Sequence, residues 1–227
     1  MEATELRAAK SQAVRAVRLW GEDAVRASRR ARYTAGTIGD RDLPSYVDED
    51  GVDPGLETET LTEVTIEADT WRWAGVPFTL RSGKAIGNPR QEVVVTFRET
   101  PRVPGGLRGA EDPTVLHIGL GSPTIALELN VNGPGDPFTV DRATLATDIG
   151  EGRLNPYGEV LQGILDRDPT LSVRSDAVEH SWGIIDQIRD AWQAGQVPLE
   201  EYPAGSPGPD WSAAHEAVSY THLTLPT

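Results

Sequence analysis

Apolar side chains recur at helical spacing near both ends of the chain, and they alternate with polar ones in its middle. In the first stretch they lie three or four residues apart, at Leu6, Ala9, Ala13, Val14 and Val17. With good helix formers between them, this spacing predicts a helix of about four turns that Gly21 ends. A second, shorter helical pattern follows around Glu22 to Arg30.

A long stretch rich in Gly, Pro and Asp, from Tyr33 to Glu57, predicts an irregular connection. Structureless loops much beyond about 15 residues are uncommon in compact domains. A connection of this length is therefore either functional or held in place by something larger.

The next segment, from Thr58 to Asp69, alternates between two kinds of side chain. One set of alternate positions holds Thr, Val, Ile and Ala, and the other holds Glu59, Glu63, Glu67 and Asp69. This alternation predicts a strand with one acidic face in solvent. Alternate strand residues are about 6.7 Å apart and diverge along a line, so the carboxylates are not expected to bind a metal.

Four further strand candidates, separated by Gly and Pro, are residues 76–81, 92–98, 114–120 and 124–132. Their mostly short links favour antiparallel pairing. In the first of them Val76, Phe78 and Leu80 are expected to face the core, with Thr79 and Arg81 facing away.

Helical spacing returns in residues 155–168 and 175–193. The apolar stripes are Val160, Leu161, Ile164 and Leu165 in the first segment, and Val178, Trp182, Ile185, Ile188 and Trp192 in the second. Asp176 followed by Glu179 resembles a capping box at the start of the second helix. The whole pattern predicts an α+β fold: a large, mostly antiparallel sheet with helices packed on one face.

We expect one domain over residues 1–200, followed by a Pro- and Gly-rich C-terminal arm over residues 201–217. The last ten residues, 218–227, continue no earlier pattern and resemble translated sequencing-adapter read-through, so we predict that this tail is not native.

Composition and charge exclude several classes of function. No run approaches the roughly 18 apolar residues that span a bilayer, and the N-terminus lacks the apolar core of a signal peptide. A cytoplasmic location without membrane contact is expected. The net charge of −14 argues against nucleic-acid binding. The first 32 residues are basic, which we interpret as a solvated helix face, with docking of an anionic partner as the alternative.

Motifs for catalysis are missing from the sequence. Without cysteine there is no disulfide, thiolate metal site or cysteine nucleophile. No dinucleotide-binding glycine motif and no phosphate-binding P-loop is present. His117, His180, His215 and His222 accompany no nucleophile-elbow motif, so we predict no catalytic residue and no metal site in this chain.

Lysine is rare in this chain, which has nineteen arginines and two lysines. One of the two, Lys84, follows Gly83 at the end of a predicted strand, where glycine lets the backbone turn and approach a ligand. Its ammonium group would suit a phosphate because it is a mobile point charge with three donors. The alternative is an ordinary surface lysine.

The segment TETLTEVTIEADTWRWAGVPFTLRSGKA closely resembles the C-terminal domain of glucose-6-phosphate dehydrogenase, and the resemblance covers roughly residues 5–195. It implies part of an NADP-dependent enzyme that oxidises glucose 6-phosphate, or a related sugar phosphate if the chain is a divergent paralogue. Its Rossmann domain and catalytic histidine would precede Met1. This chain would supply substrate-phosphate contacts and the interface of a homodimer or higher oligomer. The alternative is a non-catalytic module that dimerises or binds a sugar phosphate.

The resemblance also implies roles for single residues. Lys84 matches a lysine that contacts the substrate, and Arg90 lies one position beyond a second basic site, which here is Pro89. Arg81 matches an arginine that some members use for a second, structural NADP. An Arg and a Gln on a family strand are His117 and Gly119 here, which departs from the pattern of that NADP site.

Overall fold

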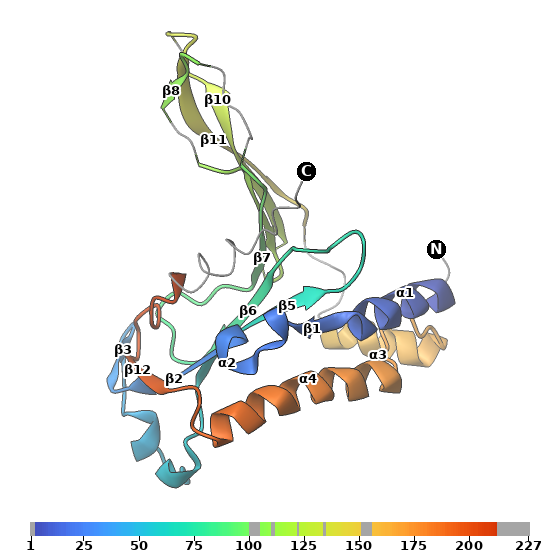
Figure 1. Cartoon of the computed structure of the whole chain (residues 1–227), viewed down its shortest axis with the longest axis vertical. Helices are drawn as coiled ribbons and strands as arrows, with labels where there is room; N and C mark the ends of the chain where they lie inside the picture. Colours follow the sequence, from blue (N-terminus) through green and yellow to red (C-terminus); the bar gives the residue numbers. More distant parts are fainter. Residues whose placement is uncertain are drawn as a thin grey trace, which may run out of the picture. The chain divides into compact units, whose positions relative to one another are not determined.

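A computed structural model describes residues 3–99, 105–109, 112–121, 123–133, 135–150 and 156–212. The predicted tail at residues 218–227 lies outside them. The chain forms two compact units: one holds the described residues up to Asn88 and from Tyr157 onward, and the other holds Pro89–Pro156. Helices and mostly antiparallel strands make up the described chain (Figure 1), which confirms the α+β class.

The first unit is built on a five-stranded sheet. Its strands are β1 (Val17–Leu19), β2 (Ser28–Thr34), β5 (Leu61–Ala68), β6 (Phe78–Gly83) and β12 (Leu199–Pro203). Their order is β1-β5-β2-β12, with β6 also paired to β5. The pairs are antiparallel except for β12, which runs parallel to β2.

The helices of this unit are α1 (Ala3–Arg15), α2 (Ala24–Ala27), α3 (Pro156–Asp166) and α4 (Ser175–Gln193). Val17 lies in strand β1, and Ser28 to Arg30 lie in strand β2, so the helical prediction for these residues was wrong. The region predicted as an irregular connection contains a hairpin of β3 (Gly36–Ile38) and β4 (Arg41–Leu43), then the 3-10 turns η2 (Tyr46–Asp48) and η3 (Pro54–Leu56).

Helix α4 covers one face of the sheet and closes the first core. The buried side chains there are Leu19, Ala27, Ile184, Ile188, Trp192 and Val197, with Val64 and Ile66 of β5 packed against them. Of the predicted stripe, Ile188 and Trp192 are buried, whereas Val178, Trp182 and Ile185 are exposed. The true inward stripe is therefore rotated along the helix toward Ala177, Ile184 and Ala191.

The opposite face of the sheet holds a second core. The prediction that this face of β5 lies in solvent was therefore wrong. Buried side chains come from β2, β5 and the C-terminal segment: Ala31, Tyr33, Leu61, Tyr202, Ala204 and Trp211. Glu63 on this face is only 6% exposed and pairs with Arg81 at 3.4 Å. Leu80, expected in the core, is 55% exposed on the other face of β6. The segment beginning at Glu201 thus contributes Tyr202, Ala204 and Trp211 to this core.

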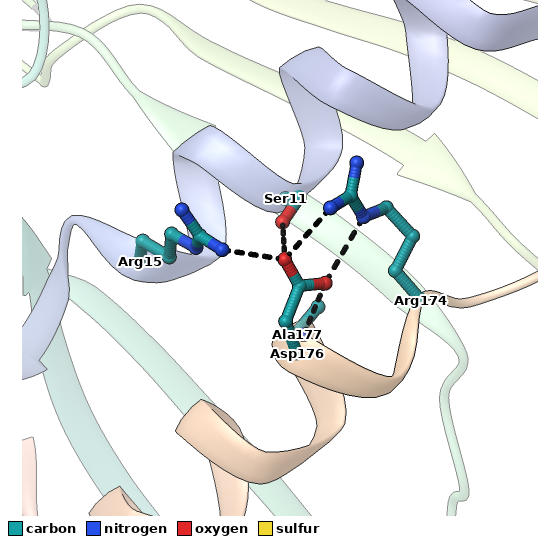
Figure 2. A network of polar contacts seen from close by, with 5 residues as sticks. All are labelled: Ser11, Arg15, Arg174, Asp176 and Ala177. Carbon is teal, nitrogen blue, oxygen red and sulfur yellow. Dashed lines mark hydrogen bonds and ion pairs between the residues drawn. The ribbon is translucent and has the colours of Figure 1, made fainter.

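Asp176 joins α1 to the start of α4 instead of capping the helix. The cap position is Arg174, which makes no side-chain cap bond, and α4 begins at Ser175. Figure 2 shows the Asp176 carboxylate accepting hydrogen bonds from Arg174, Ser11 and Arg15, the last at 2.6 Å. The capping-box interpretation was wrong because Asp176 lies inside the helix, two residues after the cap position.

This junction predicts a loss of stability in acid. Hydrogen bonds from Arg174, together with those from Ser11 and Arg15, hold the pKa of Asp176 at about 2, below its ordinary value of 3.8. A lowered pKa in the folded state stabilises the fold above about pH 4, and the contribution is lost as the pH falls toward 2. Asp176→Asn is therefore expected to melt below the wild type at pH 7, with the difference vanishing near pH 2. Thermal melts across pH 2 to 7 measure this, and a difference independent of pH would contradict it.

The second unit is a five-stranded sheet in the order β7-β9-β10-β11-β8. The strands are β7 (Glu92–Thr96), β8 (Arg108–Gly109), β9 (Val115–Gly119), β10 (Thr124–Asn132) and β11 (Thr139–Asp148). Strands β7, β9 and β10 confirm three predicted strands, while β11 was not predicted. One face carries a cross-strand row of Val95, Leu116, Leu127 and Leu145, beside a second row of Val93, Ile118 and Ile125.

Candidate functional site: the loop that carries Lys84

Strand β6 leads directly into the loop that carries Lys84. A Cβ atom at Gly83 would lie 2.5 Å from Cδ1 of the buried Leu61, its partner on the antiparallel strand β5, so a larger residue would require Leu61 to shift. From the sequence, this glycine is expected to allow close approach to a ligand. In the structure it allows close packing against Leu61, and it sets the point at which Lys84 leaves the sheet.

The backbone of Lys84 is held on both sides while its side chain stays exposed. Its amide donates to the carbonyl of Thr60 at 2.8 Å, and its carbonyl accepts from the hydroxyl of Tyr202 at 2.7 Å. The next residue, Ala85, has a φ of 53°, in the left-handed region that non-glycine residues rarely adopt. Such a conformation persists only where the surroundings enforce it. The loop therefore presents the ammonium group of Lys84 from a fixed backbone.

The C-terminal segment from Leu199 to Trp211, which we call the strap, makes further contacts with the loop. The amide of Gly205 donates to the carbonyl of Ala85 at 2.8 Å, and the amide of Gly87 donates to the carbonyl of Ser206 at 3.2 Å. A Cβ atom at Gly87 would lie 2.0 Å from the carbonyl oxygen of Gly205. The strap and the loop thus touch backbone to backbone, which only glycine allows there.

Arg81, the residue that the resemblance connects with a second NADP, is bound to the strap. Its guanidinium donates to the carbonyls of Pro207 and Pro209 at 3.1 and 3.0 Å and lies 4.9 Å from the ring centre of Trp211. It also pairs with Glu63. The role in NADP binding stays a prediction, and it would require Arg81 to give up these protein contacts.

Arg90 belongs to the second unit. Its guanidinium lies 3.4 Å from the carboxylate of Glu92, and its side chain is 66% exposed. Exposure of this kind leaves the side chain able to reach an anion. Its assignment to the substrate stays a prediction.

His117 also lies in the second unit, within a ladder of charged side chains across four strands. Its Nδ1 is 3.3 Å from Glu92, its Nε2 is 3.4 Å from Glu128, and Glu128 is paired with Arg142 at 3.2 Å. This chain therefore has a histidine between two carboxylates at the position where the resemblance expects an arginine.

Tyr202, Thr60 and Gly205 support the loop, and no sequence motif identifies them. The glycines and prolines after Tyr202 did signal turns, but they gave no indication of what the turns would touch. Among the described residues, no group of three or more His, Asp or Glu is arranged to hold a metal ion. Within that same part of the chain, no helix is both long enough and apolar enough to span a membrane.

Together, the fold and the loop define an α+β domain that presents a lysine from a backbone held by hydrogen bonds. Comparison with known proteins identifies the family. The family described as "Glucose-6-phosphate dehydrogenase, C-terminal domain" matches residues 1–221. The chain belongs to this family.

Individual relatives agree with this assignment. Glucose-6-phosphate 1-dehydrogenase of Gluconobacter oxydans is 35% identical over 216 residues, covering 92% of this chain and 44% of the relative. The enzyme of Mycolicibacterium smegmatis is 37% identical over 186 residues, covering 78% and 37%. The chain thus spans less than half the length of these relatives.

Solved structures show the same fold. A glucose-6-phosphate dehydrogenase solved with its substrate glucose 6-phosphate superposes with a TM-score of 0.79 at 21% identity, covering 98% of this chain and 46% of the other. The glucose-6-phosphate 1-dehydrogenase of Mycobacterium avium superposes with a TM-score of 0.72 at 25% identity, covering 100% and 46%.

Proposed function

We propose that this chain is the sugar-phosphate-binding and dimer-forming part of an NADP-dependent glucose-6-phosphate dehydrogenase, which oxidises glucose 6-phosphate to 6-phosphogluconolactone. The observation that carries the proposal is the presentation of Lys84: its backbone is bonded on both sides and its side chain is exposed. In this proposal the ammonium group binds the phosphate of the sugar. The resemblance, and not the geometry, also assigns Arg90 to the substrate. NADP is bound, and the chemistry performed, by a part of the enzyme that this chain does not contain.

Glucose 6-phosphate binding by the purified chain tests this proposal. Calorimetry is expected to show saturable binding of glucose 6-phosphate, weaker binding of inorganic phosphate and none of glucose, because the phosphate supplies the charged contact. The chain alone is expected to form no NADPH. Joined to the remaining half of the Gluconobacter oxydans relative, it is expected to form NADPH. Binding without activity in the joined protein would favour a non-catalytic module, and absence of binding would contradict the proposed site.

We further propose that the chain forms a homodimer or a higher oligomer through the apolar face of the second sheet. In the described chain this face exposes three large apolar side chains, Leu145, Val93 and Val95. Beside them lie two partly exposed ones, Leu116 and Ile125. A contiguous apolar face of this kind usually marks an interface. Light scattering at micromolar concentration is expected to show a dimer or larger species, and Leu145→Glu is expected to shift it toward monomer. The matched control Leu56→Glu, at an exposed leucine of the other unit, is expected to leave the mass unchanged.

A further inference from the structure

Tyr202 lies under the Lys84 loop as one of the most buried side chains of the described chain. It is 2% exposed, and burial raises the pKa of its hydroxyl, which therefore stays a proton donor. That hydroxyl has one proton, and its shortest contact is the carbonyl of Lys84 at 2.7 Å. A buried hydroxyl with a buried acceptor forms a bond that water cannot easily replace.

The direction of this contact is fixed because the carbonyl oxygen of Lys84 can only accept, and it fixes the direction of the neighbouring hydrogen bonds in turn. The hydroxyl of Thr60 accepts from the amide of Tyr33 at 3.0 Å and lies 3.0 Å from the hydroxyl of Tyr202. Since the proton of Tyr202 goes to Lys84, the Thr60 hydroxyl donates to Tyr202. Thr60 also accepts the amide of Lys84 through its own carbonyl. Hydrogen bonds of Thr60 and Tyr202 thus connect strands β2 and β12 to the loop.

The backbone beyond Lys84 needs this support. Ala85 holds a left-handed conformation, which is unfavourable for a non-glycine residue. Its carbonyl is tied to Gly205 of the strap, three residues after Tyr202. Without these bonds the chain at residues 84–85 would relax to other conformations. The Cα atom of Lys84 would then move, and its long, flexible side chain would sample a larger volume.

We propose that Tyr202 is a positioning residue for Lys84: its hydroxyl bond to the Lys84 carbonyl holds the loop in the conformation that aims the ammonium group at the substrate phosphate. Tyr202 does not touch the substrate. This inference rests on the proposed function, which assigns Lys84 to the sugar phosphate. It extends that function by making the C-terminal strap part of the binding site.

The chain offers a matched control in Tyr33. This tyrosine lies in the same core, with its ring 6.4 Å from that of Tyr202, and it is 5% exposed. Its hydroxyl donates to Glu49, away from the loop. Tyr202→Phe and Tyr33→Phe therefore remove the same atom from the same core, and only the first removes a bond to Lys84.

Calorimetry with glucose 6-phosphate and hydrogen exchange of the purified chain test the proposal. Tyr202→Phe is expected to weaken binding about three- to tenfold, the loss that one hydrogen bond implies. It is also expected to speed amide exchange at Lys84, Gly87 and Gly205. Tyr33→Phe is expected to bind as the wild type does, although both variants melt at lower temperature.

Ala85→Gly provides a second variant whose folding is not in doubt, because glycine relieves the left-handed strain. It is expected to keep the melting temperature and to bind glucose 6-phosphate as the wild type does, since glycine adopts the left-handed conformation without strain and the bonds from Tyr202 and Gly205 remain.

The outcomes separate the inference from the proposed function. If Lys84→Ala weakens binding while Tyr202→Phe leaves both binding and exchange unchanged, the positioning role is overturned and the proposed function stands. Equal weakening in Tyr202→Phe and Tyr33→Phe would show general loosening of the core and would also overturn it. If Lys84→Ala binds as the wild type does, the proposed site fails and the inference falls with it.

Discussion

Replacing Lys84 with alanine is expected to lower kcat/KM for glucose 6-phosphate about 10- to 150-fold in an active dehydrogenase that contains this chain. The change removes a charge-assisted hydrogen bond worth roughly 1.5 to 3 kcal/mol. Because the phosphate lies far from C1 of the sugar, most of the loss is expected in KM, with some in kcat if the contact also orients the sugar. The KM for the coenzyme is expected to hardly change.

The other lysine of the chain is the matched control. Lys10 donates to the carbonyl of Thr170 on the surface, so Lys10→Ala removes the same charge at a different place. It is expected to leave the kinetics unchanged.

Arg90→Ala is expected to have a smaller effect than Lys84→Ala, since Arg90 lies one position beyond the second basic site of the family. Unchanged sugar-phosphate kinetics in Lys84→Ala, with loss of coenzyme binding, would show that the loop serves the coenzyme instead.

Replacing Trp211 with alanine is expected to lower the free energy of unfolding by about 3 to 5 kcal/mol, the usual cost of removing a buried tryptophan. Trp211 is 6% exposed, its indole donates to Glu200 at 2.9 Å, and Arg81 stacks on its ring. Its loss opens a cavity beneath the strap and leaves Arg81 without its aromatic partner.

Thermal and denaturant melts measure this effect. A loss of 3 to 5 kcal/mol corresponds to a drop of about 6 to 20 °C in a chain of this size. The control is Trp71→Ala, because Trp71 is 90% exposed and its removal is expected to change stability by less than about 0.5 kcal/mol. Equal melting temperatures for the two variants would mean that the strap is not part of the cooperative fold.

Local patterns identified the elements that carry a clear signal in their own residues. Strands β7, β9 and β10 lie where strand-like runs separated by Gly and Pro predicted them, and helices α3 and α4 lie where helical spacing predicted them. Strand β11 has no comparable pattern, since charged and apolar residues mix along it, and it forms by pairing with β10 over nine residues. The start of strand β2 was predicted as part of a short helix, and the three arginines of the strand gave no strand pattern to correct this. Arg30 is nevertheless buried there: its guanidinium lies over the ring of Trp192 and donates to the carbonyl of Val197.

Alternation showed that two sets of side chains face opposite ways, but it did not show which set is covered. The acidic positions of β5 were assigned to solvent because carboxylates are rarely buried. Glu63 is buried where β6 places Arg81 beside it, and Arg81 is in turn bonded to the strap. Leu80 lies on the other face of β6 and is exposed. The assignment of faces depended on a segment more than 120 residues away.

By itself, the sequence determined the α+β class, the family resemblance and the choice of Lys84 as the candidate phosphate contact. These follow from composition, from local period and from an ordered motif, all of which are written along the chain. The tertiary structure alone decided how Lys84 is held, because Thr60, Tyr202 and Gly205 meet the loop through hydrogen bonds between segments up to 142 residues apart. Such bonds depend on which backbone segments pack together, and no periodic pattern in the sequence indicates them.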